Sequence, residues 1–279
     1  MTSFPFPVKE LPAPTLRRVL RPADDDYVHF EHGQHLPFDA TAAAFSPVNA
    51  WWLADAMLLA YWPDGEVERR YKSAGFALVV TLIKKGTQCF VAIHHAFAVV
   101  SFRGTEPDSL RDILSDVKLA LKPWKVAGER VHDGFQDALE DVWQPLRETL
   151  EPLHDRQVWF TGHSLGGALA TLAADRHLID CRRQAGGIYT YGSPLIGDGA
   201  FVDGFNRRNG ERSFRFVNDR DSVTTVPPRL LGYRHVNHER FVGFDDRNVL
   251  NLAEPLIDHT PRRYAVLAWN SLVESTPSV

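Results

Sequence analysis

A serine between two glycines marks the point where an apolar stretch gives way to helix-forming residues. The run Gly162-His163-Ser164-Leu165-Gly166 follows the β-favouring residues 157–161 and precedes the alanine- and leucine-rich residues 168–174. This pattern predicts a strand that turns sharply into a helix, with Ser164 at the bend. The glycines permit the turn because they carry no Cβ, and the helix start directs free N–H groups at the serine. The alternative is a glycine-rich turn of no catalytic use.

A serine that attacks a substrate needs a base to take its proton and an acid to orient that base. In folds built on such a turn, the acid and then a histidine follow the serine along the chain. The alternating residues 213–218 predict a strand that ends just before Asp219 and Asp221. Both aspartates are therefore candidates for the acid. Their alternative role is ordinary turn chemistry, where aspartate is common.

The base is expected on a loop before a C-terminal helix. His259 fits, because Pro261 and the residues after it predict a helix with proline near its first turn. His235 and His238 compete for the role, but residues 234–242 predict a strand rather than a loop. Chain order and position therefore favour His259 as the base.

Negative charge that develops on a substrate oxygen needs backbone donors, an oxyanion hole. The first expected donor is the N–H of Leu165, the residue after the serine. The second is expected after an earlier strand, and the buried-strand pattern of residues 96–102 ends at Arg103-Gly104-Thr105. Thr105 can offer both its N–H and its hydroxyl group.

Six blocks of sequence in one order closely resemble the class 3 lipases, the fungal-type triacylglycerol lipases with feruloyl esterases and plant acylhydrolases as relatives. They extend over roughly residues 75–270 and comprise residues 101–105, 131–135, 162–167, 189–194, 217–228 and 258–259. The resemblance implies an α/β-hydrolase fold, with a mostly parallel central sheet flanked by helices, a short helical lid and an irregular N-terminal arm. One departure is Leu195-Ile196-Gly197-Asp198, where relatives commonly carry a basic residue and an asparagine.

The resemblance also implies the hydrolysis of carboxylic esters, most simply triacylglycerols or other fatty-acyl esters, without a cofactor or metal. It assigns Ser164 as nucleophile, Asp221 as acid and His259 as base, with Thr105 and Leu165 in the oxyanion hole. Alternatives on the same scaffold are a short-chain esterase, a phospholipase or galactolipase, a thioesterase, a peptidase, or an inactive binding protein.

The chain predicts one domain over residues 1–279, because α/β folds of this length need not divide. Residues 1–45 are proline-rich and predict an arm on the core. Residues 106–124 place apolar side chains at helical spacing. This stripe predicts a lid that could contact a lipid surface transiently, and the alternative is a helix packed permanently on the core.

Charge and cysteine content restrict the class of protein. The formal charge of −4 argues against a nucleic-acid partner. Cys89 and Cys181 predict two free structural thiols, which favours a reducing compartment. Residues 1–10 lack the pattern of a signal peptide, and no apolar run predicts a membrane span. We therefore expect a cytoplasmic protein, or one exported without a visible signal peptide.

Strands are expected near residues 76–83, 88–93, 97–102, 157–161, 187–191, 213–218 and 234–242. Helices are expected from Ser46-Pro47 to about residue 61, and near residues 134–151, 166–179, 199–208 and 262–273. The strand–helix alternation predicts a mostly parallel sheet covered on both faces. The first three strands, joined by short turns, predict an antiparallel extension.

Overall fold

The computed structural model describes residues 6–11, 22–23, 27–104, 120–218, 221–236, 239–242 and 257–275. A seven-stranded sheet has the order β1-β2-β3-β6-β7-β8-β9, and β4 and β5 form a separate two-stranded sheet. The strands are β1 (Leu78–Lys84), β2 (Thr87–Ile93), β3 (Phe97–Phe102), β4 (Leu121–Pro123), β5 (Arg130–His132), β6 (Gln157–His163), β7 (Gly187–Tyr191), β8 (Ser213–Asn218) and β9 (Glu239–Val242).

Strands β3 to β9 of the large sheet pair in parallel, whereas β1 and β2 extend it in antiparallel fashion. Both predictions about the sheet are thus confirmed. Parallel strands end at the same edge of a sheet, which is where α/β folds bind ligands. The register Phe102↔Gly162 aligns the end of β3 with the glycine-serine turn after β6.

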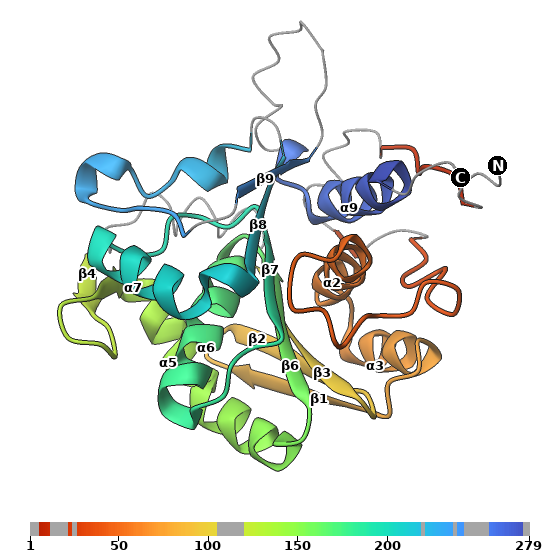
Figure 1. The fold of residues 1–279 in the computed structure, drawn as a ribbon, viewed down its shortest axis with the longest axis horizontal. Helices are drawn as coiled ribbons and strands as arrows, with labels where there is room; N and C mark the ends of the chain where they lie inside the picture. Colours follow the sequence, from red (N-terminus) through yellow and green to blue (C-terminus); the bar gives the residue numbers. More distant parts are fainter. Residues whose placement is uncertain are drawn as a thin grey trace, which may run out of the picture.

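Helices cover both faces of the sheet (Figure 1). One face carries α2 (Pro47–Leu59), α3 (Asp64–Ser73) and α9 (Pro261–Ser275), and the other carries α5 (Asp133–Leu150), α6 (Leu165–Cys181) and α7 (Gly199–Asn209). Short 3₁₀ turns are η1 (Glu151–Leu153), η2 (Gly210–Arg212), η3 (Ser222–Thr225) and η4 (Arg229–Leu231). Ser46 caps α2 and Pro47 opens it, as the sequence predicts.

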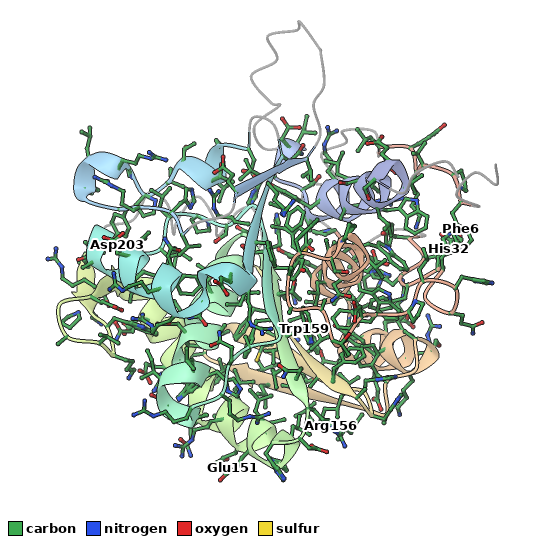
Figure 2. The ribbon with its side chains drawn as sticks, in the orientation of Figure 1. Phe6, His32, Glu151, Arg156, Trp159 and Asp203 are labelled. Atoms are coloured by element: carbon green, nitrogen blue, oxygen red, sulfur yellow. The ribbon has the colours of Figure 1, made fainter. Side chains whose placement is uncertain are left out.

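Each face of the sheet has its own apolar core. Trp51, Trp159 and Trp269 belong to the core under α2 and α9, and Figure 2 shows Trp159 at the centre of the molecule. Phe135 and Phe160 belong to the core under α5, α6 and α7. The cores fix the sheet from both sides and hold its carboxyl edge in place.

The described residues near the N-terminus lie against the first of these cores. Phe6 stacks on His32 with ring centroids 4.1 Å apart (Figure 2). The N–H of Lys9 donates to Asn270 Oδ1 at 2.7 Å, and Trp269 Nε1 donates to the carbonyl of Pro7 at 2.9 Å. Both ends of the described chain therefore meet at α9. The boundary of the arm at residue 45, and the single domain, remain predictions.

Two local expectations are wrong, and one helix was not expected. Leu121–Pro123 form β4, so the helical stripe predicted over residues 106–124 does not reach Trp124. Of the described residues between 234 and 242, only Glu239–Val242 form a strand. Helix α3 was not expected, because only Val67 and Tyr71 of its ten residues are buried.

Both cysteines are free, with Cys89 buried in β2 and Cys181 at the end of α6. Within the described ranges, every helix is too short or too polar to cross a lipid bilayer.

Candidate active site

Ser164 lies at the bend between β6 and α6 with an unusual backbone conformation. Its φ is 58° and its ψ is −129°, a region that residues with a Cβ rarely occupy. Its N–H donates to the carbonyl of Tyr191 on the neighbouring strand at 3.0 Å, and its side chain is fully buried. The surrounding structure therefore holds the strained turn that the sequence predicts.

The glycines around the serine are required by close backbone approach. A Cβ on Gly162 would lie 2.2 Å from the carbonyl oxygen of Gly166. A Cβ on Gly166 would lie 2.3 Å from the carbonyl oxygen of Phe102, at the end of β3. Both distances are far below van der Waals contact, so α6 can start directly beside β3 only with glycine at these positions.

Asp221 and His259 form a buried hydrogen-bonded pair after β8 and before α9. His259 Nδ1 lies 2.9 Å from Asp221 Oδ1 and 2.8 Å from Oδ2. Asp221 is 2% exposed and His259 is 7% exposed. The N–H of Val223 also donates to Asp221 Oδ1, at 2.9 Å. Because a carboxylate only accepts, His259 Nδ1 carries a proton, which leaves Nε2 as the ring nitrogen that faces away from the carboxylate.

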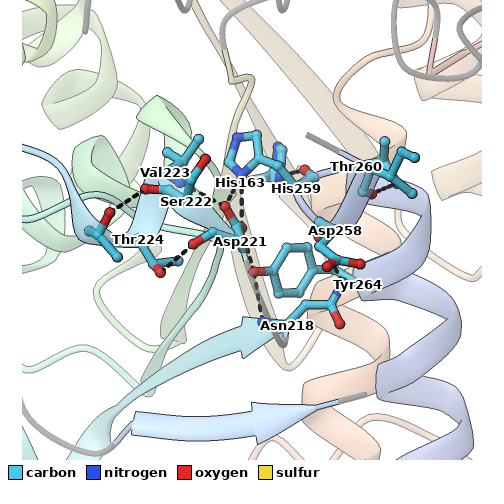
Figure 3. A network of polar contacts seen from close by, with 12 residues as sticks. His163, Asn218, Asp221, Ser222, Val223, Thr224, Asp258, His259, Thr260 and Tyr264 are labelled. Atoms are coloured by element: carbon cyan, nitrogen blue, oxygen red, sulfur yellow. Dashed lines mark hydrogen bonds and ion pairs between the residues drawn. The ribbon is translucent and has the colours of Figure 1, made fainter. Parts of the chain in front are cut away.

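Tyr264 holds the second oxygen of the same carboxylate. Its hydroxyl group donates to Asp221 Oδ2 at 2.6 Å and accepts from the N–H of Asn218 at 3.0 Å. Figure 3 shows Asp221 between His259 and Tyr264. The position of Asp221 is thus fixed by the end of β8, by η3 and by α9 together.

The serine hydroxyl oxygen and one ring nitrogen of the histidine are buried atoms without a hydrogen-bond partner among the described residues. These atoms are Ser164 Oγ and His259 Nε2. Buried polar atoms normally have a partner. A serine oxygen and a histidine ring nitrogen left free at one site are the groups that a bound substrate would engage, and such contacts are often long before substrate binds.

His163, the residue before the serine, supports His259 from below. Its Nε2 donates to the carbonyl of His259 at 2.6 Å, and its Nδ1 accepts from the Tyr61 hydroxyl at 2.8 Å. The two histidine rings lie 4.4 Å apart. Burial, and secondly the nearby His259, hold the pKa of His163 well below its usual value. His163 is therefore a neutral side chain that connects the turn after α2 to the His259 backbone.

Gly192 closes the site on the side of β7. Its φ is +58°, and a Cβ there would lie 2.7 Å from Asp221 Oδ2 and 3.1 Å from His259 Nδ1. The glycine of the Gly-Ser-Pro block thus leaves room for the pair.

Of the predicted site residues, Ser164, Leu165, Asp221 and His259 lie in the described structure. Leu165 is the first residue of α6, and none of the hydrogen bonds among the described residues uses its N–H. Thr105 lies outside the described residues, as do Asp219, His238 and most of the predicted lid. Gly104, directly before Thr105, packs against the elbow: its Cβ would lie 2.5 Å from the carbonyl oxygen of His163.

His235, the described competitor for the base, lies in a different environment. Its Nε2 donates to the carbonyl of Thr224, and its pKa is lowered to about 3 by burial and by Arg215. Its Nδ1 has no hydrogen-bond partner among the described residues. The pair with Asp221 belongs to His259.

Three residues that contribute to the site were not predicted from the sequence: His163, Tyr264 and Gly192. Each lies beside a predicted residue in the sequence or in a quoted block, but its role depends on a contact between distant segments. Tyr264 could have been found as the residue one turn into the helix after His259 that faces back toward β8. Among the described residues, no group of three or more His, Cys, Asp or Glu side chains could hold a metal ion.

Part of the sequence matches a known protein family. Residues 99–231 match the family described as Lipase (class 3). A secreted mono- and diacylglycerol lipase of Malassezia restricta is 39% identical over 151 residues, 49% of this chain and 49% of that protein. A lipase of Rhizomucor miehei is 33% identical over 157 residues, 51% of this chain and 41% of that protein. The chain spans about half the length of the curated relatives it matches.

Solved structures extend the similarity beyond the matched sequence. The crystal structure of a lipase from Rhizopus microsporus var. chinensis superposes with a TM-score of 0.58 and 27% identity, over 75% of this chain and 80% of that one. The Rhizomucor miehei triacylglyceride lipase gives a TM-score of 0.54 and 26% identity, over 66% and 78%. Residues 99–231 thus match the class 3 lipase family, and the chain shares the α/β-hydrolase fold of solved fungal lipases.

Proposed function

We propose that this chain hydrolyses carboxylic esters of fatty acids through Ser164, Asp221 and His259. The observation that carries the proposal is the buried Asp221–His259 pair at the same sheet edge as the strained Ser164. The names of the relatives, mono- and diacylglycerol lipase and lipase, support acylglycerols as the substrate class.

The proposed reaction has two halves. His259 Nε2 takes the Ser164 proton as the serine oxygen attacks the ester carbonyl, and Asp221 stabilises the imidazolium that forms. The protonated histidine then gives its proton to the leaving alcohol, and the acyl group remains on the serine. Water, deprotonated by the same nitrogen, releases the fatty acid and restores the site.

The oxyanion of both tetrahedral intermediates needs donors that are in place before the reaction. The N–H of Leu165 points from the start of α6, where the helix dipole also favours negative charge. We assign the second donor to Thr105. Loss of one such donor typically lowers the rate about 10²–10³-fold.

The substrate range decides between lipase and esterase. We expect wild-type protein to hydrolyse p-nitrophenyl esters from acetate to palmitate and emulsified triacylglycerol, and Ser164→Ala to lose on the order of 10⁶ in kcat. Activity on short soluble esters alone would make the protein an esterase. Absence of wild-type activity on every ester would contradict the proposal. It would favour a thioesterase, a peptidase or a binding protein without catalytic activity.

The identity of the base is tested by two histidine substitutions. His259→Ala should lower kcat by a factor on the order of 10⁶, because it removes the only proposed proton acceptor. His235→Ala should retain most of the activity, since its ring bonds a backbone carbonyl. The opposite ranking would overturn the assignment. In the same assay Asp221→Asn should cost far more than Asp219→Asn.

We further propose that the segment from Glu106 toward Ala120 acts as the lid and that the protein works where thiols stay reduced. The free Cys89 and Cys181 support the second point, although the named relatives are secreted proteins. Fractionation of the native host cell, with the protein detected in the medium or in the cytosol, decides between the two compartments.

A further inference from the structure

The loop after Asp221 carries the most exposed large apolar side chain of the described residues. Leu230, in the middle of η4, is 99% exposed, and its neighbour Leu231 is 48% exposed. Pro228, Arg229 and Gly232 on either side are also exposed. We call residues 228–232 the tip. A single exposed leucine is ordinary on a protein surface, but two consecutive exposed leucines in one turn form a small apolar patch.

The tip is held outward by an ordered framework. Within it, the N–H of Leu231 donates to the carbonyl of Pro228 at 3.0 Å, and Gly232 takes a φ of +90°. At its base, Pro227 and Tyr233 are buried, and the N–H of Arg234 donates to the carbonyl of Gly197 at 2.9 Å. The leucines are therefore displayed by a packed turn, rather than exposed by a loose one.

The tip is basic, although the whole chain is acidic. Residues 222–236 contain Arg229 and Arg234 and no aspartate or glutamate, whereas the chain has a formal charge of −4. Both arginines are exposed, and Arg234 also donates to the carbonyl of Arg229 at 3.2 Å. Two apolar side chains beside two guanidinium groups match a surface that has an acyl interior and anionic head groups.

The tip also lies on the side of the molecule where the site is built. Asp221 caps η3, and η3 leads directly to the tip. Tyr233, at the base of the tip, donates to the carbonyl of Ala120 at 3.4 Å, and Ala120 belongs to the segment 106–124 that the sequence predicts as a lid. In Figure 1 the light-blue segment that carries η3 and η4 reaches the outer edge of the molecule, above α7. A lipid surface that touches the tip would therefore also face the site.

We propose that Leu230 and Leu231, with Arg229 and Arg234, form an anchor that inserts into anionic lipid surfaces independently of the lid. The leucines enter the boundary between head groups and acyl chains, and the guanidinium groups pair with lipid phosphates or carboxylates. This inference rests on the proposed function, and it adds a fixed contact that presents the site to its substrate.

Binding is tested apart from catalysis in the Ser164→Ala background. Vesicles of phosphatidylcholine mixed with phosphatidylglycerol, and of phosphatidylcholine alone, are sedimented with full-length protein. Leu230→Ser/Leu231→Ser should weaken partition into the mixed vesicles at least about tenfold, as expected when two leucines lose apolar burial. The matched control is Leu78→Ser/Ile83→Ser on β1, whose side chains are 50% and 61% exposed. This control should bind as the parent does.

The charge is tested separately. Arg229→Gln/Arg234→Gln should abolish the preference for mixed over neutral vesicles, and added salt should reproduce that loss in the parent. A preference that survives both changes would overturn the electrostatic half of the proposal.

Three outcomes keep this proposal distinct from the proposed function. With Ser164 intact, the leucine variant should hydrolyse a short soluble ester at the wild-type rate and lose activity on emulsion. Equal vesicle binding by the tip and control variants would overturn the anchor, whatever the esterase assay gives. A change in self-association on ultracentrifugation with unchanged vesicle binding would also overturn it, and would make the tip a protein contact.

Discussion

The Asp221–His259 pair occupies the space where a Cβ atom of residue 192 would lie, so only glycine fits at this position. Its φ is +58°, and an added Cβ would lie 2.7 Å from Asp221 Oδ2. We therefore expect Gly192→Ala to displace the carboxylate and lower kcat about 10²-fold, since a shift of roughly 1 Å can cost that much. KM on a soluble ester should change little. Steady-state kinetics on p-nitrophenyl butyrate measures both.

Gly199→Ala is the matched control, because a Cβ at that position meets no atom within 4 Å. It should keep wild-type kinetics. If Gly192→Ala did so too, the pair would tolerate displacement and the geometric argument would fail.

Among single residues, the sequence predicts those whose roles follow from the order of motifs along the chain. It misses those whose roles depend only on contacts in the folded protein. Ser164, Asp221 and His259 follow from the motif, the strand ends and the resemblance. The roles of His163 and Tyr264 depend on how β6 and α9 approach each other, with the His163 and His259 rings 4.4 Å apart. Nothing in their sequence spacing fixes that distance.

At the scale of elements, Arg208 of α7 joins three segments through one side chain. It donates to both oxygens of Glu129, at 2.6 and 2.7 Å, and to Asp175 of α6 at 2.9 Å. Asp175 also accepts from Trp124 Nε1 at 2.8 Å. Glu129 and Asp175 are buried, so Arg208→Ala removes the cation that both carboxylates pair with and should lower the free energy of unfolding by about 3–5 kcal/mol.

Urea denaturation followed by tryptophan fluorescence measures that loss. The neighbouring Arg207 is exposed, and Arg207→Ala should stay within about 0.5 kcal/mol of wild type. Equal values for the two variants would mean that the network adds no stability.

Elements were predicted well where one residue pattern dominates. The bounds of α5, β7 and β8 lie within one residue of expectation. Helix α3 was missed because charged residues fill it, and i,i+4 pairs such as Lys72 with Glu68 hold it instead of an apolar face. Strand β4 was missed because the helical spacing of apolar residues in the segment before it continues through β4 to Trp124.

For the whole molecule, buried histidines set the response to acid. Burial lowers the pKa of His132 to about 4, that of His177 to about 4 and that of His235 to about 3, from 6.5. As pH falls below 6.5, these histidines bind protons in the unfolded chain but stay neutral in the folded chain. The stability from these groups is full above pH 6.5 and is lost progressively as pH falls toward 4. Asp55 opposes this trend, since burial raises its pKa to about 6.

His177 offers the clearest test because it is 1% exposed and neither ring nitrogen has a partner among the described residues. His177→Leu should reduce the slope of unfolding free energy against pH, between pH 6.5 and 4, by up to about 1.4 kcal/mol per pH unit. The exposed His154 is the control, and His154→Leu should leave the slope unchanged. An unchanged slope in both would contradict the burial argument.

The packing of α9 against Pro7 and Lys9 has a consequence for synthesis. Ser164 and its turn lie more than ninety residues before His259, and helix α9, which follows that histidine, packs on α2 and bonds Pro7 and Lys9. On the ribosome, the serine and its strained bend emerge long before the proposed base can dock. Until α9 packs onto α2 and bonds Pro7 and Lys9, the nascent chain thus carries the serine without the proposed base that would deprotonate it.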